Sequence, residues 1–246
     1  MDSVILGGIV FCCLLGAALI GALLRRYLPE PHLSTESKDA IKLPTAIVAT
    51  LSAIALGLLT ASAKTTFDRA EVQLKTTVAQ VVVLDRVMVS YGPQTLEARR
   101  LLRDFVVTQL DPLKRGTATS EFGIEAVQNN LRSLVPETAP QRLLQARALE
   151  ISGKITEAYW LLVESESEEP PLPFVVVLVL WLTLLFGTFG LLAPFNATVA
   201  CTVLVCALCV AGAVFLITDM AHPHLGLIHV SDAPFRAALD YIGRPN

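Results

Sequence analysis

Four long apolar runs constrain this chain more than any other feature of its sequence. A helix needs about 20 mostly apolar residues to cross a hydrocarbon core about 30 Å thick. The runs cover residues 4–24, 43–63, 172–192 and 197–218, and none contains a charged residue. They predict four transmembrane helices. Arg25 and Arg26 follow the first run, whereas a cleaved signal peptide carries its positive charge before the apolar run, so the first helix is predicted to be retained.

The composition agrees with a protein embedded in lipid. Charged residues make up 17% of the chain, whereas soluble domains carry about 25%. The net charge of -3 provides no basic surface for a phosphate backbone, so we expect no nucleic-acid partner. All five cysteines lie within the apolar runs, without disulfide or zinc-ligand spacing, and are interpreted as small apolar side chains.

Residues 64–171 have a soluble composition and are predicted to be helical. After the second run, apolar residues recur at three- and four-residue steps, and no proline occurs between Thr45 and Tyr91, so one long helix is expected to leave the membrane and end at Gly92. Further helices are predicted at 94–110, 121–134 and 140–169. The side chains expected to face the insert core are Phe67, Leu74, Val78, Val81, Leu84, Met88 and Tyr91 on the long helix, and Leu96, Leu102, Phe105, Leu143, Ile151 and Ile155 on the others.

The resulting fold class is an all-α integral membrane protein with four transmembrane helices and a helical soluble insert between helices two and three. The predicted domains are 1–63 (helices one and two), 64–171 (the insert), 172–219 (a helical hairpin) and 220–246 (a tail). In the tail, Ser231 is expected to cap a short amphipathic helix that docks through Phe235, Leu239 and Tyr241 on the membrane or on the insert.

An even number of helices places both termini and the insert on one side of the membrane. Arg25 and Arg26, directly after helix one, favour a cytoplasmic linker and an external insert, whereas Lys64 and Lys75 after helix two favour the reverse. The external insert is slightly favoured. The expected location is a cell membrane.

The second helix carries the first candidate site. Its stripe of small and hydroxyl side chains comprises Ala46, Ala49, Thr50, Ala53, Gly57, Thr60, Ala61 and Lys64. Thr50, Gly57, Thr60 and Lys64 are the pore-lining candidates, since such a stripe can line a channel. The alternative is close helix packing, because small residues let backbones approach. Gly8, Cys12 and Gly16 on the first helix present a similar face, for which packing is the favoured interpretation.

Asp219, at the end of the fourth helix, is the second candidate, as a pore-mouth or coupling residue, because ionisable groups near a membrane are functional candidates. Lys42, Lys64 or His222 are its expected partners, and the alternative is a solvated helix end. An acidic collar precedes the third helix and consists of Glu164, Glu166, Glu168 and Glu169. Three interpretations are open for Arg99, Arg100 and Arg103: pairing with this collar, binding of anions, or a solvated helix face, which is the default.

Signals for catalysis, cofactors and metals are missing from the sequence. It contains no nucleophile elbow, zinc-protease helix or phosphate-binding loop, so we expect no enzyme activity, no catalytic residue and no cofactor. His222, His224 and His229 lie near Asp219, but Pro223 disrupts any regular presentation of these side chains, and we expect no metal site.

Five segments of the sequence resemble the bestrophin-like family of bacterial membrane proteins. They are LPEPHLSTESKDAIKL (28–43), LGLLTASAK (56–64), VLDRVMVSYGP (83–93), WLTLLFGTFGLLAPFNATV (181–199) and GLIHVSDAPFRAAL (226–239). The family's name reflects a proposed similarity to bestrophins, which are pentameric four-span anion channels. Ala221 and His222 replace a charged pair that relatives tend to carry, so no ion site built on that pair is expected here.

Two functional hypotheses follow. In the first, the chain is a homo-oligomeric bestrophin-like ion channel whose partners are the lipid bilayer, further copies of itself and inorganic ions. In the second, it is a non-conducting sensor or scaffold whose insert binds a partner and whose spans anchor it.

Overall fold

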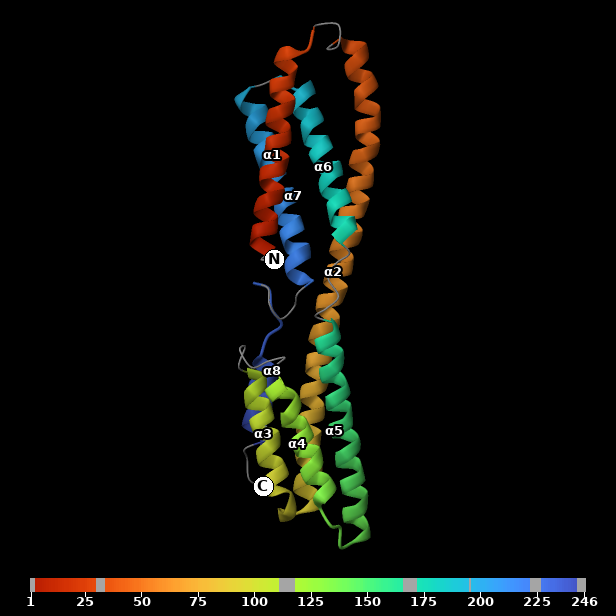
Figure 1. Ribbon diagram of the computed structural model, residues 1–246, viewed down its shortest axis with the longest axis vertical. Helices are drawn as coiled ribbons and strands as arrows, with labels where there is room; N and C mark the ends of the chain where they lie inside the picture. Colours follow the sequence, from red (N-terminus) through yellow and green to blue (C-terminus); the bar gives the residue numbers. More distant parts are fainter. Residues whose placement is uncertain are drawn as a thin grey trace. The chain divides into compact units, whose positions relative to one another are not determined.

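The computed structural model of the protein describes residues 3–29, 34–110, 118–165, 172–194, 196–221 and 227–242 (Figure 1). Every regular element in these ranges is helical. The elements are α1 (Ser3–Tyr27), α2 (Thr35–Tyr91), η2 (Pro93–Thr95), α3 (Leu96–Leu110), α4 (Ala118–Ser133), α5 (Ala139–Ser165), α6 (Leu172–Leu192), α7 (Ala197–Met220) and α8 (Ala233–Ile242).

The chain divides into two compact units. Met1–Phe67 and Glu169–His229 form the first, named here the membrane-helix unit, and Asp68–Glu168 and Val230–Asn246 form the second, named the insert unit. Helix α2 contributes residues to both units.

Among the described residues, four helices are long and apolar enough to cross a bilayer, namely α1, α2, α6 and α7. The prediction of four apolar helices is therefore confirmed. The hairpin between α6 and α7 is closed by Asn196, whose side-chain Oδ1 accepts a hydrogen bond of 2.8 Å from the Val199 N–H and so caps the first turn of α7.

Helix α2 begins earlier than the apolar run predicts. Ser34 initiates it, because its Oγ accepts the Ser37 N–H at 3.3 Å and its carbonyl accepts the Lys38 N–H at 3.0 Å. Pro44 therefore lies inside the helix, where it removes one backbone donor. Part of the segment expected to link the first two spans, from Thr35 onward, is therefore helical, since a polar N-cap starts a helix without any need for apolar residues.

The end of α2 at Tyr91 is set by Gly92 and Thr95. Gly92 has a φ of 125°, a conformation that residues with a side chain rarely adopt. The buried Thr95 Oγ1 donates to the carbonyl oxygen of Met88, at 2.7 Å. This contact satisfies one of the carbonyl groups left open at a helix C-terminus and turns the chain into η2 and α3.

The membrane-helix unit is built around α1, which packs against both α6 and α7 (Figure 1). The apolar core that joins these three helices consists of Val10, Leu14, Ala18, Leu178, Leu182, Leu185, Phe186, Ala207 and Val214. One face of α2 packs against this core through Val48, Ala49, Ala55, Leu56 and Leu59, all of them only partly buried.

Glycines bring the backbones of α1 and α6 into direct contact. A Cβ atom at Gly190 would overlap the carbonyl oxygen of Ala18, and one at Gly21 would overlap the carbonyl oxygen of Gly187. Small residues allow such approaches between helices in lipid. In contrast, a Cβ atom at Gly8 or Gly16 would meet no other atom within 4 Å, so the expectation of close packing on that face of α1 is wrong.

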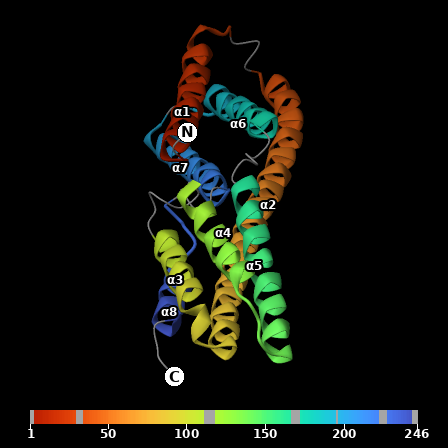
Figure 2. The same cartoon turned by 60° about the horizontal axis from the view of Figure 1, so that its bottom comes forward.

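The insert unit packs α3 against α4 and α8, and α4 against α5 (Figure 2). Six of the seven core residues predicted on α2 are buried, the exception being the half-buried Phe67. On the other helices, Leu102, Phe105, Ile151 and Ile155 are buried as predicted. Leu96 and Leu143 were wrongly predicted as core, because each lies in the first turns of its helix and is more than half exposed.

The C-terminal helix α8 docks on the insert rather than lying apart from it. Phe235, Ala238 and Ile242 are buried, whereas Tyr241 is 53% exposed. The Ser231 Oγ accepts the Ala233 N–H at 3.3 Å, so this hydroxyl bridges the residue before the helix to its first residue. Docking on the insert is one of the two predicted positions, and the contact between α3 and α8 confirms it.

Substitution of Gly190 by Ala should destabilise the membrane-helix unit by about 1–3 kcal/mol, because the added methyl group would force the backbones of α1 and α6 apart. Thermal unfolding in a single detergent would measure this. Gly16→Ala is the matched control and should leave stability unchanged or slightly raised, since its methyl group meets no neighbour. Equal melting temperatures for the two variants would contradict the packing described here.

Candidate functional site

The apolar part of α2 presents three faces. Among the described residues, one of these faces packs against other helices of the protomer. The inward face packs against the core of α1, α6 and α7 and includes Ser52 and Ala63, which are 3% and 6% exposed. A second face carries the bulky residues Ile47, Leu51, Ile54 and Leu58, all at least 45% exposed. In a bilayer, such a face is suited to contact with acyl chains.

The third face is the predicted stripe of small and hydroxyl side chains. Ala46, Thr50, Ala53, Gly57, Thr60, Ala61 and Lys64 are all exposed, and only Ala49 turns partly toward the core. A Cβ atom at Gly57 would meet no atom within 4 Å. Close packing within one chain, the alternative interpretation of this stripe, therefore does not account for it, because these residues stay exposed in the part of the chain that the structure describes.

The hydroxyl groups on this face are bonded to their own helix. Thr50 Oγ1 donates to the carbonyl oxygen of Ala46 at 2.9 Å, and Thr60 Oγ1 donates to that of Leu56 at 2.8 Å. Bonds of this kind allow hydroxyl side chains to lie in an apolar environment at little cost. The Lys64 Nζ lies 5.5 Å from the centre of the Phe67 ring, which adds a positive charge at the C-terminal end of the stripe.

Asp219 is buried at the end of α7, with 1% of its surface exposed. Its Oδ1 accepts the Leu227 N–H at 3.0 Å and its Oδ2 accepts the Ile228 N–H at 2.7 Å. A solvated helix end is therefore the wrong interpretation of this residue. Its two bonds are to backbone donors rather than to Lys42 or Lys64, while His222 lies outside the described residues. Asp219 thus fixes the backbone of Leu227 and Ile228 beside the end of α7.

An ion pair that the sequence interpretation missed lies in the insert unit. Arg99 on α3 binds the buried Asp85 on α2, with an Nε–Oδ1 distance of 2.7 Å and side-chain exposures of 22% and 2%. Arg99 Nη2 also donates to the Ile242 carbonyl oxygen at the end of α8, at 3.3 Å. The guanidinium therefore joins three helices, and the expectation of a solvated face is wrong for this arginine.

The position of Asp85 gave a signal that was available in the sequence. It lies four residues after Val81 and three before Met88, on the face that carries the predicted core. A carboxylate in that register requires a partner.

The ion pairs on α5 are exposed, unlike the pair of Asp85 and Arg99. Hydrogen bonds from Lys154 and then Arg147 lower the pKa of the Glu150 carboxyl, but water screens these charges.

No group of three or more His, Cys, Asp or Glu side chains within the described ranges is placed to hold a metal ion. His222 and His224 of the predicted tail cluster lie outside those ranges, and His229 is exposed. The acidic collar at 164–169 also falls outside the side chains that the structure describes.

These features define a class of protein before any comparison is made. Four candidate membrane-spanning helices surround an apolar core, and one of them exposes a polar, small-residue face that ends in a lysine. This is the arrangement of a helical membrane protein.

The chain belongs to the bestrophin-like family. The Bestrophin-like domain matches residues 12–235, which include most of the first candidate span, the other three candidate spans, the insert and the start of α8. The resemblance inferred from the five sequence segments is thereby confirmed. No curated protein and no solved structure matches the chain.

Asp219→Asn should destabilise the protein by about 1–3 kcal/mol, because a neutral amide cannot replace a carboxylate that accepts two backbone N–H groups. Hydrogen exchange at Leu227 and Ile228 should become faster. Asp39→Asn is the control, since Asp39 is exposed and its ion pair with Lys42 is also exposed. Unchanged exchange at both amides would show that Asp219 does not anchor this segment.

Arg99→Met should cost about 3–5 kcal/mol, because it leaves the buried Asp85 carboxylate without its charged partner. Arg100→Met is the matched control and should cost at most about 1 kcal/mol, since Arg100 is exposed. Thermal unfolding of the full chain would compare them. The Asp85→Leu, Arg99→Met double variant should recover part of the loss, and a double variant less stable than Arg99→Met would refute this account.

Proposed function

We propose that the chain is the subunit of a homo-oligomeric bestrophin-like ion channel, in which Thr50, Gly57, Thr60 and Lys64 line a pore shared between copies. The observation that supports this most directly is the exposed stripe on α2. Small side chains leave room for a neighbouring copy to approach. The stripe ends in the ammonium group of Lys64, which favours water or a partner over lipid. Thr50 and Thr60 are exposed in the protomer.

The core of the membrane-helix unit argues for a pore between copies rather than through one. An apolar cluster joins α1, α6 and α7, and the buried polar residues described on these helices, Thr218 and Asp219, lie at the end of α7. An ion crossing through that core would lose its hydration without gaining polar ligands. A ring of α2 helices from several copies, in contrast, would place hydroxyl oxygens and the Lys64 ammonium around a common axis.

Family membership supports the same proposal. Bestrophins, to which the family's name relates it, are oligomeric anion channels with four spans per subunit, and this chain offers four candidate spans. Lys64, at the end of the stripe, would attract anions toward one mouth of the pore. Asp219 would act at the membrane boundary by fixing the segment after α7.

The proposal includes a location. The channel lies in the inner membrane of a bacterial cell, with both termini and the insert on the same side, and the external side is slightly favoured. Arg25 and Arg26 at the end of α1 support this orientation through the preference of short cytoplasmic loops for basic residues.

Thr60→Leu should abolish most of the ion flux through the protein in proteoliposomes, because a leucine narrows the pore and makes its lining apolar. Chloride and potassium gradients would be tested separately. Thr65→Leu is the matched control, since Thr65 is also exposed on α2 and also donates to the carbonyl four residues earlier, at 2.8 Å, but lies outside the stripe. The control should conduct as the unchanged protein does.

Two outcomes would contradict the channel. One is equal flux in the Thr60 and Thr65 variants, which would move the conduction path away from the stripe. The other is a reconstituted protein that is monomeric by mass, since a shared pore requires several copies.

A scaffold is the second candidate, and one feature of the insert favours it. Val72 and Val83 on α2 are 62% and 47% exposed, and both lie on the side of the helix away from the insert core. In the scaffold candidate, these two valines would contribute to the surface that binds a partner. A stable oligomer without flux under either gradient would favour this candidate.

A further inference from the structure

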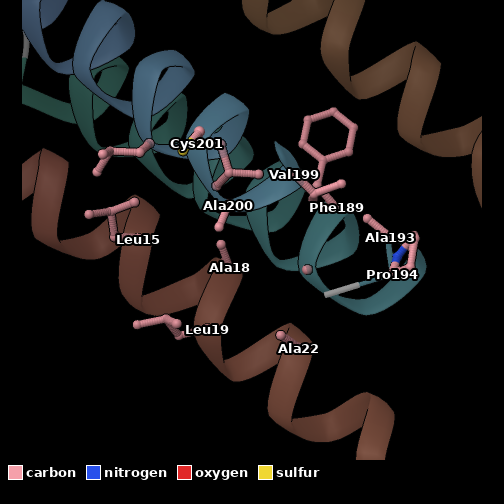
Figure 3. Close-up of a pocket in the computed structure, with 13 residues that line it drawn as sticks. Leu15, Ala18, Leu19, Ala22, Phe189, Ala193, Pro194, Val199, Ala200 and Cys201 are labelled. Atoms are coloured by element: carbon pink, nitrogen blue, oxygen red, sulfur yellow. The ribbon is translucent and has the colours of Figure 1, made fainter. Parts of the chain in front are cut away.

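An apolar groove lies between α1 and the hairpin of α6 and α7, with a volume of about 330 Å³ (Figure 3). Its walls are formed on one side by Leu15, Ala18, Leu19 and Ala22 of α1 and on the other by residues at the end of α6 and the start of α7, among them Phe189, Ala200, Cys201 and Leu204. None of the lining residues carries a charge, a hydroxyl group or an amide side chain.

The packing of the helices explains why a groove forms here. Gly190 brings the backbone of α6 against Ala18, so the two helices touch at this point. Ala22 and Ala200 have side chains too short to fill the space beside that contact. The bulky residues at the edge of the groove stay largely exposed, with Leu19 at 55%, Phe189 at 47% and Leu204 at 46%. An exposed edge of this kind requires hydrocarbon rather than water.

Positive charge lies at one end of the groove. Arg25 and Arg26 follow the groove-lining residues of α1, and the spacing of Leu19, Ala22 and Arg26 continues one side of the helix. The Arg25 Nη1 reaches the carbonyl oxygen of Leu192, at 3.5 Å, which places this guanidinium beside the end of α6. Arg26 is exposed. An arginine pair at a helix end can bind a phosphate group through charge-assisted hydrogen bonds.

We infer that the groove holds an acyl chain of an anionic phospholipid whose phosphate lies at Arg25 and Arg26. An apolar channel accepts a hydrocarbon chain, and basic residues at its membrane boundary recognise an anionic head group. A groove volume near the lower end of the range for small-molecule sites, about 300–1,000 Å³, suits part of a single chain. This inference requires α1, α6 and α7 to lie in a bilayer, but it does not require the protein to conduct ions.

Native mass spectrometry of the full-length protein tests the groove. The protein would be reconstituted in vesicles of equal parts phosphatidylcholine and phosphatidylglycerol and then released in a mild detergent. The unchanged protein should retain phosphatidylglycerol. Cys201→Phe should lose it, because the ring fills the groove. Cys206→Phe is the matched control on the same helix, since Cys206 is also exposed but does not line the groove, and it should retain the lipid.

The head group is tested with Arg26→Gln. This variant should still retain lipid but should lose the preference for phosphatidylglycerol over phosphatidylcholine. Lys42→Gln, which removes an exposed charge at the start of α2, is the control and should keep the preference. Leu19→Phe fills the groove from the opposite wall and replaces Cys201→Phe if circular dichroism shows that the latter is unfolded.

Three results would overturn the inference. They are retention of phosphatidylglycerol by folded Cys201→Phe and Leu19→Phe, an unchanged lipid preference in Arg26→Gln, and a change of oligomeric mass in the groove variants without a change in bound lipid. The third result would identify the groove as a contact between copies. Flux measured on the same samples separates these outcomes from failure of the channel proposal.

Discussion

Direct backbone contact between α1 and α6 is the interaction on which the rest of the membrane-helix unit depends. Gly21, Gly187 and Gly190 carry no side chain at the crossing, so dispersion contacts form between main chains rather than between side chains. This contact brings α1, α6 and α7 together around one apolar core, so these helices bury apolar side chains against one another. The same crossing leaves the groove beside it.

Helix α2 differs from the other three spans because one of its faces packs against the described helices and the other two are exposed. Its inward face completes the core, while its bulky face and its small polar face remain exposed. The bulky face suits lipid, whereas the small face ends in a charged lysine, which does not. In the insert unit the same helix is anchored by buried apolar residues, among them Leu84 and Met88, and also by the buried Asp85 carboxylate, which Arg99 links to α3 and to the end of α8. Apolar packing therefore fixes the helix in both units, and the insert unit adds a buried ion pair.

The elements of the fold were predictable because their signals are local. Hydropathy defined the four apolar helices, and periodicity defined the buried face of α2 at Leu84 and Met88. Contacts between distant segments were not predictable in the same way. Glycine spacing on α1 suggested Gly8 and Gly16 as contact points, but the partner helix selects Gly21 instead. Likewise, the stripe on α2 could be recognised from sequence. Its exposure depends on where the other helices of the protomer pack, which the spacing of residues along α2 does not show.

The internal bonds of Thr50 and Thr60 determine what their face offers to a neighbouring ion. Each hydroxyl hydrogen is directed at a carbonyl oxygen of its own helix, so the outward side of each oxygen presents lone pairs. In the proposed pore, these lone pairs would favour a cation as the hydroxyls stand. To meet an anion, each hydroxyl would have to turn its hydrogen about the Cβ–Oγ1 bond and release its bond to the helix, or the anion would have to rely on the ammonium of Lys64. The preference of such a pore for positive or negative ions would therefore depend on the orientation of two hydroxyl groups as well as on the identity of the residues.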